Sequence, residues 1–125
     1  MEQEIASFDY TVTSVTVRND PDGAKRFEIN FEGAIVGGWE ATTLATMQLR
    51  TRDLQNGRFT TVGVAYLKDG KVMDAEVSGI MQTLPGHKWR TRGQTLTPDG
   101  RAILVQGEIE LATRRYTGKY FSVDQ

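Results

Sequence analysis

The chain has 125 residues, a formal net charge of -1 at pH 7 and no cysteine. The balanced charge gives no long-range attraction to nucleic acid or to anionic membranes, so neither is expected as a partner. The lack of cysteine excludes disulfides, thiolate metal sites and cysteine nucleophiles. Length and ordinary soluble composition predict a single domain over residues 1–125.

The segment Met1-Glu2-Gln3-Glu4 is acidic and has no apolar stretch of the kind found in secretory signals. No apolar run in the chain approaches the roughly 18 residues of a membrane-spanning helix. We therefore expect a cytoplasmic protein.

Turn signals recur between runs of alternating apolar and polar residues, a pattern typical of an antiparallel β-meander. The first signal, Pro21-Asp22-Gly23, suits a three-residue turn that ends in a left-handed glycine. This turn pairs Val17 with Phe27 and Val15 with Ile29. The two strands around it should therefore share one apolar face.

The predicted first strand changes phase before this hairpin. Tyr10 and Val12 alternate out of step with Val15, which predicts a bulge or bend near Thr13-Ser14. After the hairpin, Gly37-Gly38 interrupts the apolar segment, either as a turn or as a glycine bend at a barrel corner.

The pair Asn56-Gly57 is a strong signal for a two-residue type I′ turn. Such a turn sets Leu49 opposite Val64 and Met47 opposite Tyr66. Val64 and Tyr66 are thereby predicted to lie on the apolar face.

A second two-residue turn at Asp69-Gly70 would bring Tyr66 onto Met73 and Val64 onto Ala75. The two turns select the same apolar face independently. Because a slip of one residue would turn the whole strand over, we predict that Val64 and Tyr66 point into the core.

The pair Pro85-Gly86 allows two loop lengths. A two-residue loop puts Trp89 on the outer face, whereas a three-residue loop that includes His87 turns Trp89 toward Thr83 and the core. We predict the longer loop, because burying an indole removes much apolar surface from water.

The turn Pro98-Asp99-Gly100 repeats the three-residue chemistry and pairs Trp89 with Ile109. On the opposite face it sets Lys88 against Glu110. Glutamates thus stand across from a basic strand face, which we interpret as a solvated surface rather than a phosphate site. The basic residues of this face are Lys88, Arg90 and Arg92.

A break near Thr113-Arg114-Arg115 completes about eight strands, and no segment shows sustained helical periodicity. A meander with one apolar face removes its exposed edges by closing on itself. The sequence therefore predicts an all-β fold, an antiparallel meander of about eight strands closed into a small barrel. At this size the barrel is either filled by side chains or holds one small ligand.

The predicted interior is rich in aromatic and methionine side chains. These suit either a filled core or an apolar pocket with a few orienting hydroxyls. On the pocket interpretation, the ligand-binding residues are Trp39, Met47, Tyr66, Met73, Trp89 and Tyr116. The other side chains predicted to face inward are Phe27, Ile29, Phe31, Leu49, Val62, Val64, Ala75, Val77, Met81, Ile103, Val105, Ile109, Leu111 and Tyr120.

Signals for catalysis and metal binding are sparse. His87 is the only histidine, and no predicted register places a carboxylate beside it, so we expect an exposed loop residue. The facing of Glu40 stays open, because it follows the Gly37-Gly38 interruption. Buried in a cavity, this carboxyl would be poised as an acid or a base. We expect no metal site and no cofactor.

Three stretches carry a family resemblance: Phe31-Glu32-Gly33-Ala34-Ile35-Val36-Gly37-Gly38-Trp39-Glu40, Gly107-Glu108-Ile109-Glu110-Leu111 and Tyr116-Thr117-Gly118-Lys119-Tyr120. In these stretches, in length and in its meander, the chain resembles the small bacterial barrels grouped with allene oxide cyclase. The resemblance implies an eight-stranded barrel, often in a symmetric oligomer, whose cavity binds an apolar molecule or steers a ring closure. It carries no catalytic residue over to this chain and therefore concerns the fold.

Three functions follow from these patterns. The leading hypothesis is a barrel that binds a small, mostly apolar ligand in its interior. The second is an isomerase or cyclase that holds a flexible apolar substrate in the same cavity. The third is a filled barrel that assembles as a homo-oligomer or with another partner, which a full core and an external apolar patch would favour.

Overall fold

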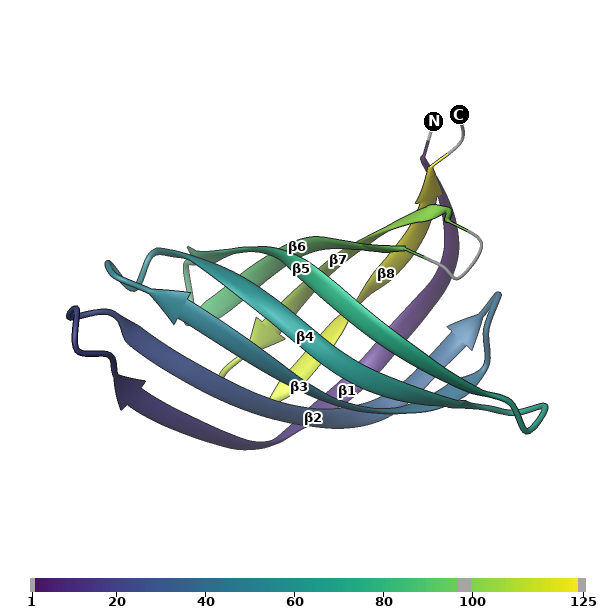
Figure 1. The fold of residues 1–125 in the computed structure, drawn as a ribbon, viewed down its shortest axis with the longest axis horizontal. Coiled ribbons are helices and arrows are strands. Elements are labelled where there is room, and N and C mark those ends of the chain that lie inside the picture. The colour runs from purple at the N-terminus through teal and green to yellow at the C-terminus, as the bar shows by residue number, and fades with distance from the viewer. Residues whose placement is uncertain (1, 97–99, 124–125) are drawn as a thin grey trace.

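The computed structural model describes residues 2–96 and 100–123, which form eight antiparallel strands closed into a barrel (Figure 1). Each strand pairs with the next in the chain, and the first and last strands pair to close the sheet. The predicted fold class is confirmed. None of the described segments forms a helix that could cross a membrane. The strands are β1 (Glu2–Asn19), β2 (Lys25–Gly37), β3 (Ala41–Thr51), β4 (Asn56–Leu67), β5 (Val72–Leu84), β6 (Lys88–Leu96), β7 (Ala102–Glu110) and β8 (Arg115–Val123).

Three of the predicted registers are confirmed. Val17 pairs with Phe27 across the β1–β2 hairpin, and Thr83 pairs with Trp89 across the β5–β6 hairpin. Trp89 also pairs with Ile109 between β6 and β7. The Thr97, Pro98 and Asp99 positions of the predicted β6–β7 turn lie outside the described residues.

The two predicted irregularities are also present. The pairing of β1 with β2 shifts between Val12 and Ser14, where the bulge was expected. Gly37 ends β2, so Gly37-Gly38 forms part of the turn into β3 rather than a bend within a strand. The last break falls at residues 111–114, immediately before β8.

The turn between β3 and β4 differs from the prediction, because the chain reverses over residues 52–55 and Asn56-Gly57 begins β4. Asp53 Oδ1 accepts hydrogen bonds from the backbone N–H groups of Gln55 at 2.8 Å and of Asn56 at 2.9 Å. The Thr51 hydroxyl donates to the Asn56 carbonyl at 2.6 Å. Side chains of this loop thus hold a turn that the Asn-Gly signal does not describe.

This turn reverses the facing of β4. Leu49 pairs with Phe59 and Met47 with Thr61, so the predicted partners Val64 and Tyr66 were wrong. Because side chains alternate along a strand, the side chain of Val62 also turns outward.

The β4–β5 turn is one residue longer than predicted. The backbone N–H of Leu67 donates to the Lys71 carbonyl at 2.8 Å, and Gly70 has a φ of 95°, which closes a three-residue loop. Tyr66 therefore pairs with Val72 instead of Met73.

Two phenylalanine rings fill the barrel by covering glycines on the neighbouring strands. The ring of Phe8 lies over Gly118 and Gly107, where an added Cβ would come within 2.5 Å and 2.9 Å of Phe8 Cζ. Phe59 likewise extends toward Gly93, where a Cβ would lie 3.1 Å from Phe59 Cζ. These glycines allow large rings to pack flat inside a narrow barrel.

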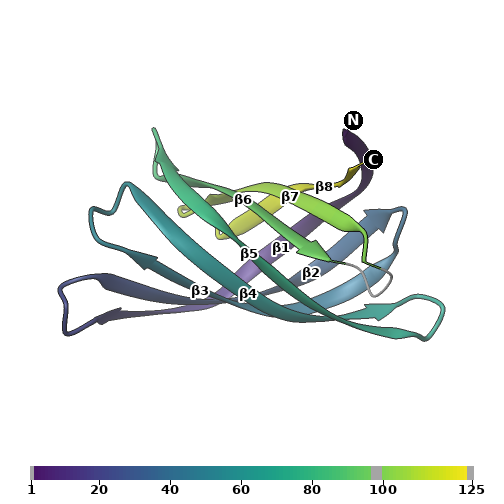
Figure 2. The same ribbon diagram turned by 45° about the horizontal axis from the view of Figure 1, so that its top comes forward.

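The barrel wall is not hydrogen-bonded along its whole length. Residues 72–77 of β5 pair with β4, whereas pairing with β6 begins only at Ser78. The β4–β5 hairpin consequently projects past the ends of β6 and β7 (Figures 1 and 2). Residues 72–77, which pair with no described residue of β6, are called the seam.

Candidate ligand cavity

The six predicted ligand-binding residues do not converge on one space. Met47 is fully buried, and Trp89 packs edge-on against Phe27 with ring centroids 5.1 Å apart. Trp39 is half-buried against Tyr120, with ring centroids 5.5 Å apart. The structure therefore places the two indoles in separate neighbourhoods.

Tyr66 points away from the barrel interior, which corrects its predicted facing. Its side chain is 49% exposed on the outer face of β4. The inner face of β4 carries Thr61 and Ala65 instead, both of which are buried. Met73 faces inward as predicted and is half-buried within the seam.

An interior cavity of about 70 Å³ is the space in which a ligand could lie. It forms where the inward residues of three adjacent strands are small, since Ala45, Gly63 and Ala75 stand in one cross-strand row. Of the six predicted ligand-binding residues, only Tyr116 lines it. The other residues that line it are Phe8, Tyr10, Phe31, Ile35, Thr43, Phe59, Thr61, Val64, Ala65, Val77, Val105 and Tyr120.

Six hydroxyls lie in or beside this cavity, and four of them form two pairs. The hydroxyls of Tyr10 and Tyr120 are 2.8 Å apart, and those of Tyr116 and Thr91 are 2.8 Å apart. The other two belong to Thr61 and Thr43. Thr43 Oγ1 is buried and has no hydrogen bond of normal length within the described part of the chain, although the Tyr10 hydroxyl lies near enough for the two groups to interact. Thr43 therefore has hydrogen-bonding capacity that its neighbours do not fully use.

The tyrosines of the cavity are neutral. Burial raises the pKa of Tyr116 and of Tyr120 well above the usual value of 10.0. Burial also raises the pKa of Tyr10, although the neighbouring hydroxyls of Tyr120 and Thr43 oppose the shift. At physiological pH these groups can donate or accept hydrogen bonds, but none is a base.

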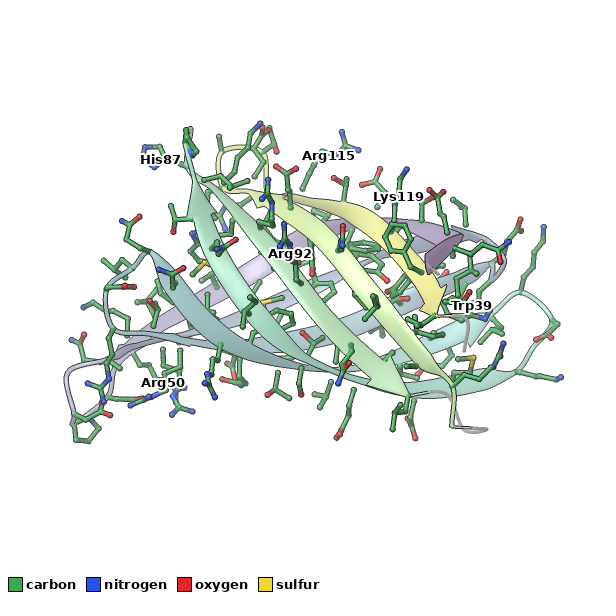
Figure 3. The ribbon with its side chains drawn as sticks, turned by 90° about the horizontal axis from the view of Figure 1, so that it is seen from above. Trp39, Arg50, His87, Arg92, Arg115 and Lys119 are labelled. Carbon is green, nitrogen blue, oxygen red and sulfur yellow. The ribbon has the colours of Figure 1, made fainter. Side chains whose placement is uncertain are left out.

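The candidate acid and base residues lie outside the cavity. Glu40 is exposed, and its Oε1 lies 3.2 Å from Lys68 Nζ. His87 is exposed at the β5–β6 turn, and Figure 3 shows it toward the end of the barrel away from Trp39. Of the lining side chains given above, none carries a carboxylate, an imidazole or an amine. The geometry therefore gives no support to acid–base catalysis.

The basic face on β6 has the predicted register. Lys88 pairs with Glu110, and Lys88 Nζ lies 3.7 Å from Glu110 Oε2. Arg90 stands opposite Glu108 without an ion pair between them. Such exposed pairs contribute little to stability.

Two cavity residues that were not among the predicted ligand-binding residues, Thr43 and Tyr10, can be recognised from the sequence as facing inward. Thr43 alternates in phase with the buried Met47 and Leu49, which marks it as inward-facing. Tyr10 belongs to the alternating run with Val12. The void beside them has no such signal, because it depends on small residues aligned across strands whose register was mispredicted.

Comparison with known proteins adds evidence on the fold. No protein-family model matches the chain, and no curated protein matches it. A solved structure, that of a protein with unknown function from Clostridium acetobutylicum ATCC 824, is similar to it with a TM-score of 0.77. The two chains are 14% identical, and the match covers 99% of each. At this identity the likeness shows a shared fold alone.

Proposed function

We propose that this protein binds a small neutral ligand, mostly apolar with one hydroxyl or carbonyl group, in the cavity beside Thr43. The observation that carries the proposal is the unpaired Thr43 hydroxyl, which is buried and lines that cavity. A buried polar group without a partner costs about 1–3 kcal/mol. A ligand that bonds Thr43 removes that cost and leaves the Tyr10–Tyr120 and Tyr116–Thr91 pairs in place.

The size of the cavity limits the ligand. Pockets for drug-sized molecules measure roughly 300–1,000 Å³, whereas this cavity measures about 70 Å³. The ligand therefore has only a few non-hydrogen atoms. It is also uncharged, because the lining offers no opposite charge to a buried ion.

The seam supplies the route of entry. Ala75 and Val77 belong to the seam and line the cavity. Both are half-buried. Among the described residues, the strand partners of residues 72–77 lie on β4, so entry of a ligand here breaks no described pairing between β5 and β6.

The test is a titration of the purified protein with acetone, 1-propanol and 2-butanone, followed by NMR of the alanine and threonine methyl groups. Saturable shifts are expected at Thr43, Ala45 and Ala75. Propionate, which has similar size but is charged, is expected to leave these methyl groups unshifted.

Two variants test the role of the hydroxyl. Thr43→Val keeps the shape but removes the hydrogen bond, so it should weaken binding about tenfold, which corresponds to about 1.4 kcal/mol. Thr117→Val is the matched control, because Thr117 is exposed on β8 and does not line the cavity. The proposal fails if no neutral probe saturates the cavity, or if Thr43→Val binds as tightly as the natural protein.

A further inference from the structure

Four arginines stand side by side on the outer face of the barrel. Arg18, Arg26, Arg50 and Arg58 are successive Cα partners on β1, β2, β3 and β4. Like charges directly opposite each other on neighbouring strands destabilise a sheet. This arginine row therefore needs carboxylates near it.

The β1–β2 loop supplies part of that charge. Asp20 Oδ2 lies 3.1 Å from Arg26 Nη2 and 3.1 Å from Arg50 Nε, and Asp22 also pairs with Arg50. Arg58 has no ion pair with any residue that the structure describes, and it borders two shallow hollows of the outer surface. The end of the row on β4 is thus left without a counter-charge.

The other end of the same face is acidic and apolar. Glu32, Asp74 and Glu76 border an outer hollow of about 690 Å³ and make no ion pair within residues 2–96 and 100–123. Large apolar side chains stand among them on the outer face of β3, β4 and β5, each 47% exposed or more. They are Leu44, Val62, Tyr66 and Val72.

We propose that this outer face of β2–β5 is the interface of a symmetric homodimer, in which the arginine end of each copy meets the acidic end of the other. The arginines and the acidic residues lie at different positions along the strands. On β4 the arginine row is at Arg58, whereas Asp74 of β5 pairs with Val64, further along β4. A two-fold axis that crosses the strands between Thr60 and Val62 brings Arg58 of one copy to Val64 and Asp74 of the other.

The same axis sets Arg26 of one copy near Glu32 of the other, because these residues occupy the corresponding rows on β2. An axis parallel to the strands would instead set the arginine rows against each other. Every contact occurs twice across the two-fold axis, so the face is fully used and assembly stops at the dimer.

The face is smaller than a standard protein–protein interface. Four strands about 4.8 Å apart, over a length of roughly 30 Å, present on the order of 600 Å² per copy. A standard interface buries about 800 Å² per partner. We therefore expect a dimer that forms at micromolar concentration and weakens with added salt, because the complementary groups are charged.

The test is sedimentation of the whole chain over a range of concentrations, with two charge-reversal variants. Arg58→Glu and Asp74→Arg should each sediment as monomers, because each homodimer would contain two repulsive contacts. An equimolar mixture of the two variants should dimerise again, since Glu at position 58 then meets Arg at position 74 while the native pair forms on the other side.

The control is Arg92→Glu on β6, outside the proposed face; Figure 3 shows Arg92 and Arg50 on different parts of the barrel. It should dimerise as the natural protein does. Circular dichroism confirms that each variant is folded. A natural protein that stays monomeric at all concentrations, single variants that still dimerise, or a mixture that stays monomeric would each overturn the proposal.

Discussion

The register of β4 can be tested by truncating one side chain on each of its faces. Phe59 is 4% exposed and its ring extends to Gly93 of β6, whereas Tyr66 is 49% exposed on the outer face. Removing a buried phenylalanine ring costs about 3–5 kcal/mol, the lost transfer free energy plus the cavity left behind. Phe59→Ala should therefore lower the free energy of unfolding by that amount. Tyr66→Ala should lower it by less than about 1 kcal/mol.

The assay is equilibrium unfolding in urea, followed by tryptophan fluorescence. Two protein concentrations are needed, because Tyr66 lies on the proposed dimer face and its loss could change association. A type I′ turn at Asn56-Gly57 would exchange the two faces. A loss of 3 kcal/mol or more for Tyr66→Ala, together with a small loss for Phe59→Ala, would refute the register described here.

Three further outcomes follow from the packing of the core. Thr43→Val should raise the free energy of unfolding of the ligand-free protein by about 1 kcal/mol, because it removes an unpaired buried hydroxyl; a loss in urea unfolding would show that Thr43 is already bonded. Gly118→Ala should cost about 1–3 kcal/mol, since its Cβ would lie 2.1 Å from the backbone oxygen of Gln106 and 2.5 Å from Phe8 Cζ; an unchanged unfolding midpoint would contradict this packing. The free energy of unfolding should fall as pH rises above 10.0. Burial raises the pKa of Tyr116 and Tyr120 in the folded state, so the unfolded state loses these protons at lower pH. Constant urea midpoints from about pH 9 to 11 would count against their burial.

Turns were predictable where one residue determines their geometry. Gly23 has a φ of 91° and Gly86 a φ of 83°, a left-handed conformation that favours glycine. The register at Gly23 was predicted from the turn signal, whereas the register at Gly86 was predicted because it buries Trp89. The loop at Gly70 was predicted one residue too short, because Asp-Gly suits both a two-residue and a three-residue loop.

The candidate site was less predictable than the fold. Tyr116 was identified as an inward residue, as was Tyr120, which follows it in the same alternation. The cavity depends on Ala45, Gly63 and Ala75 meeting across three strands, and this alignment requires the correct register of β4. Errors in the two turns that flank β4 therefore concealed the void while leaving the eight-stranded barrel intact.

The β3–β4 turn offers a test of what decides that register. Asp53 accepts hydrogen bonds from the backbone N–H groups of Asn56 and Gln55, and these bonds lower its pKa from 3.8. Asp53→Ala should therefore reduce stability at pH 7. In the natural protein this contribution is complete above about pH 4 and is lost as pH falls through the lowered pKa.

Asp53→Ala also removes the hydrogen bonds that hold the observed turn. Nothing in the loop then opposes the preference of Asn56-Gly57 for a type I′ turn. We expect the register to hold, because a slip would expose Phe59 and bury the wrong face of β4. Cross-strand contacts between Leu49 and Phe59 in NMR spectra are the readout. Their replacement by contacts between Leu49 and Val64 would show that the local turn, and not burial of the inner face, determines how these strands pair.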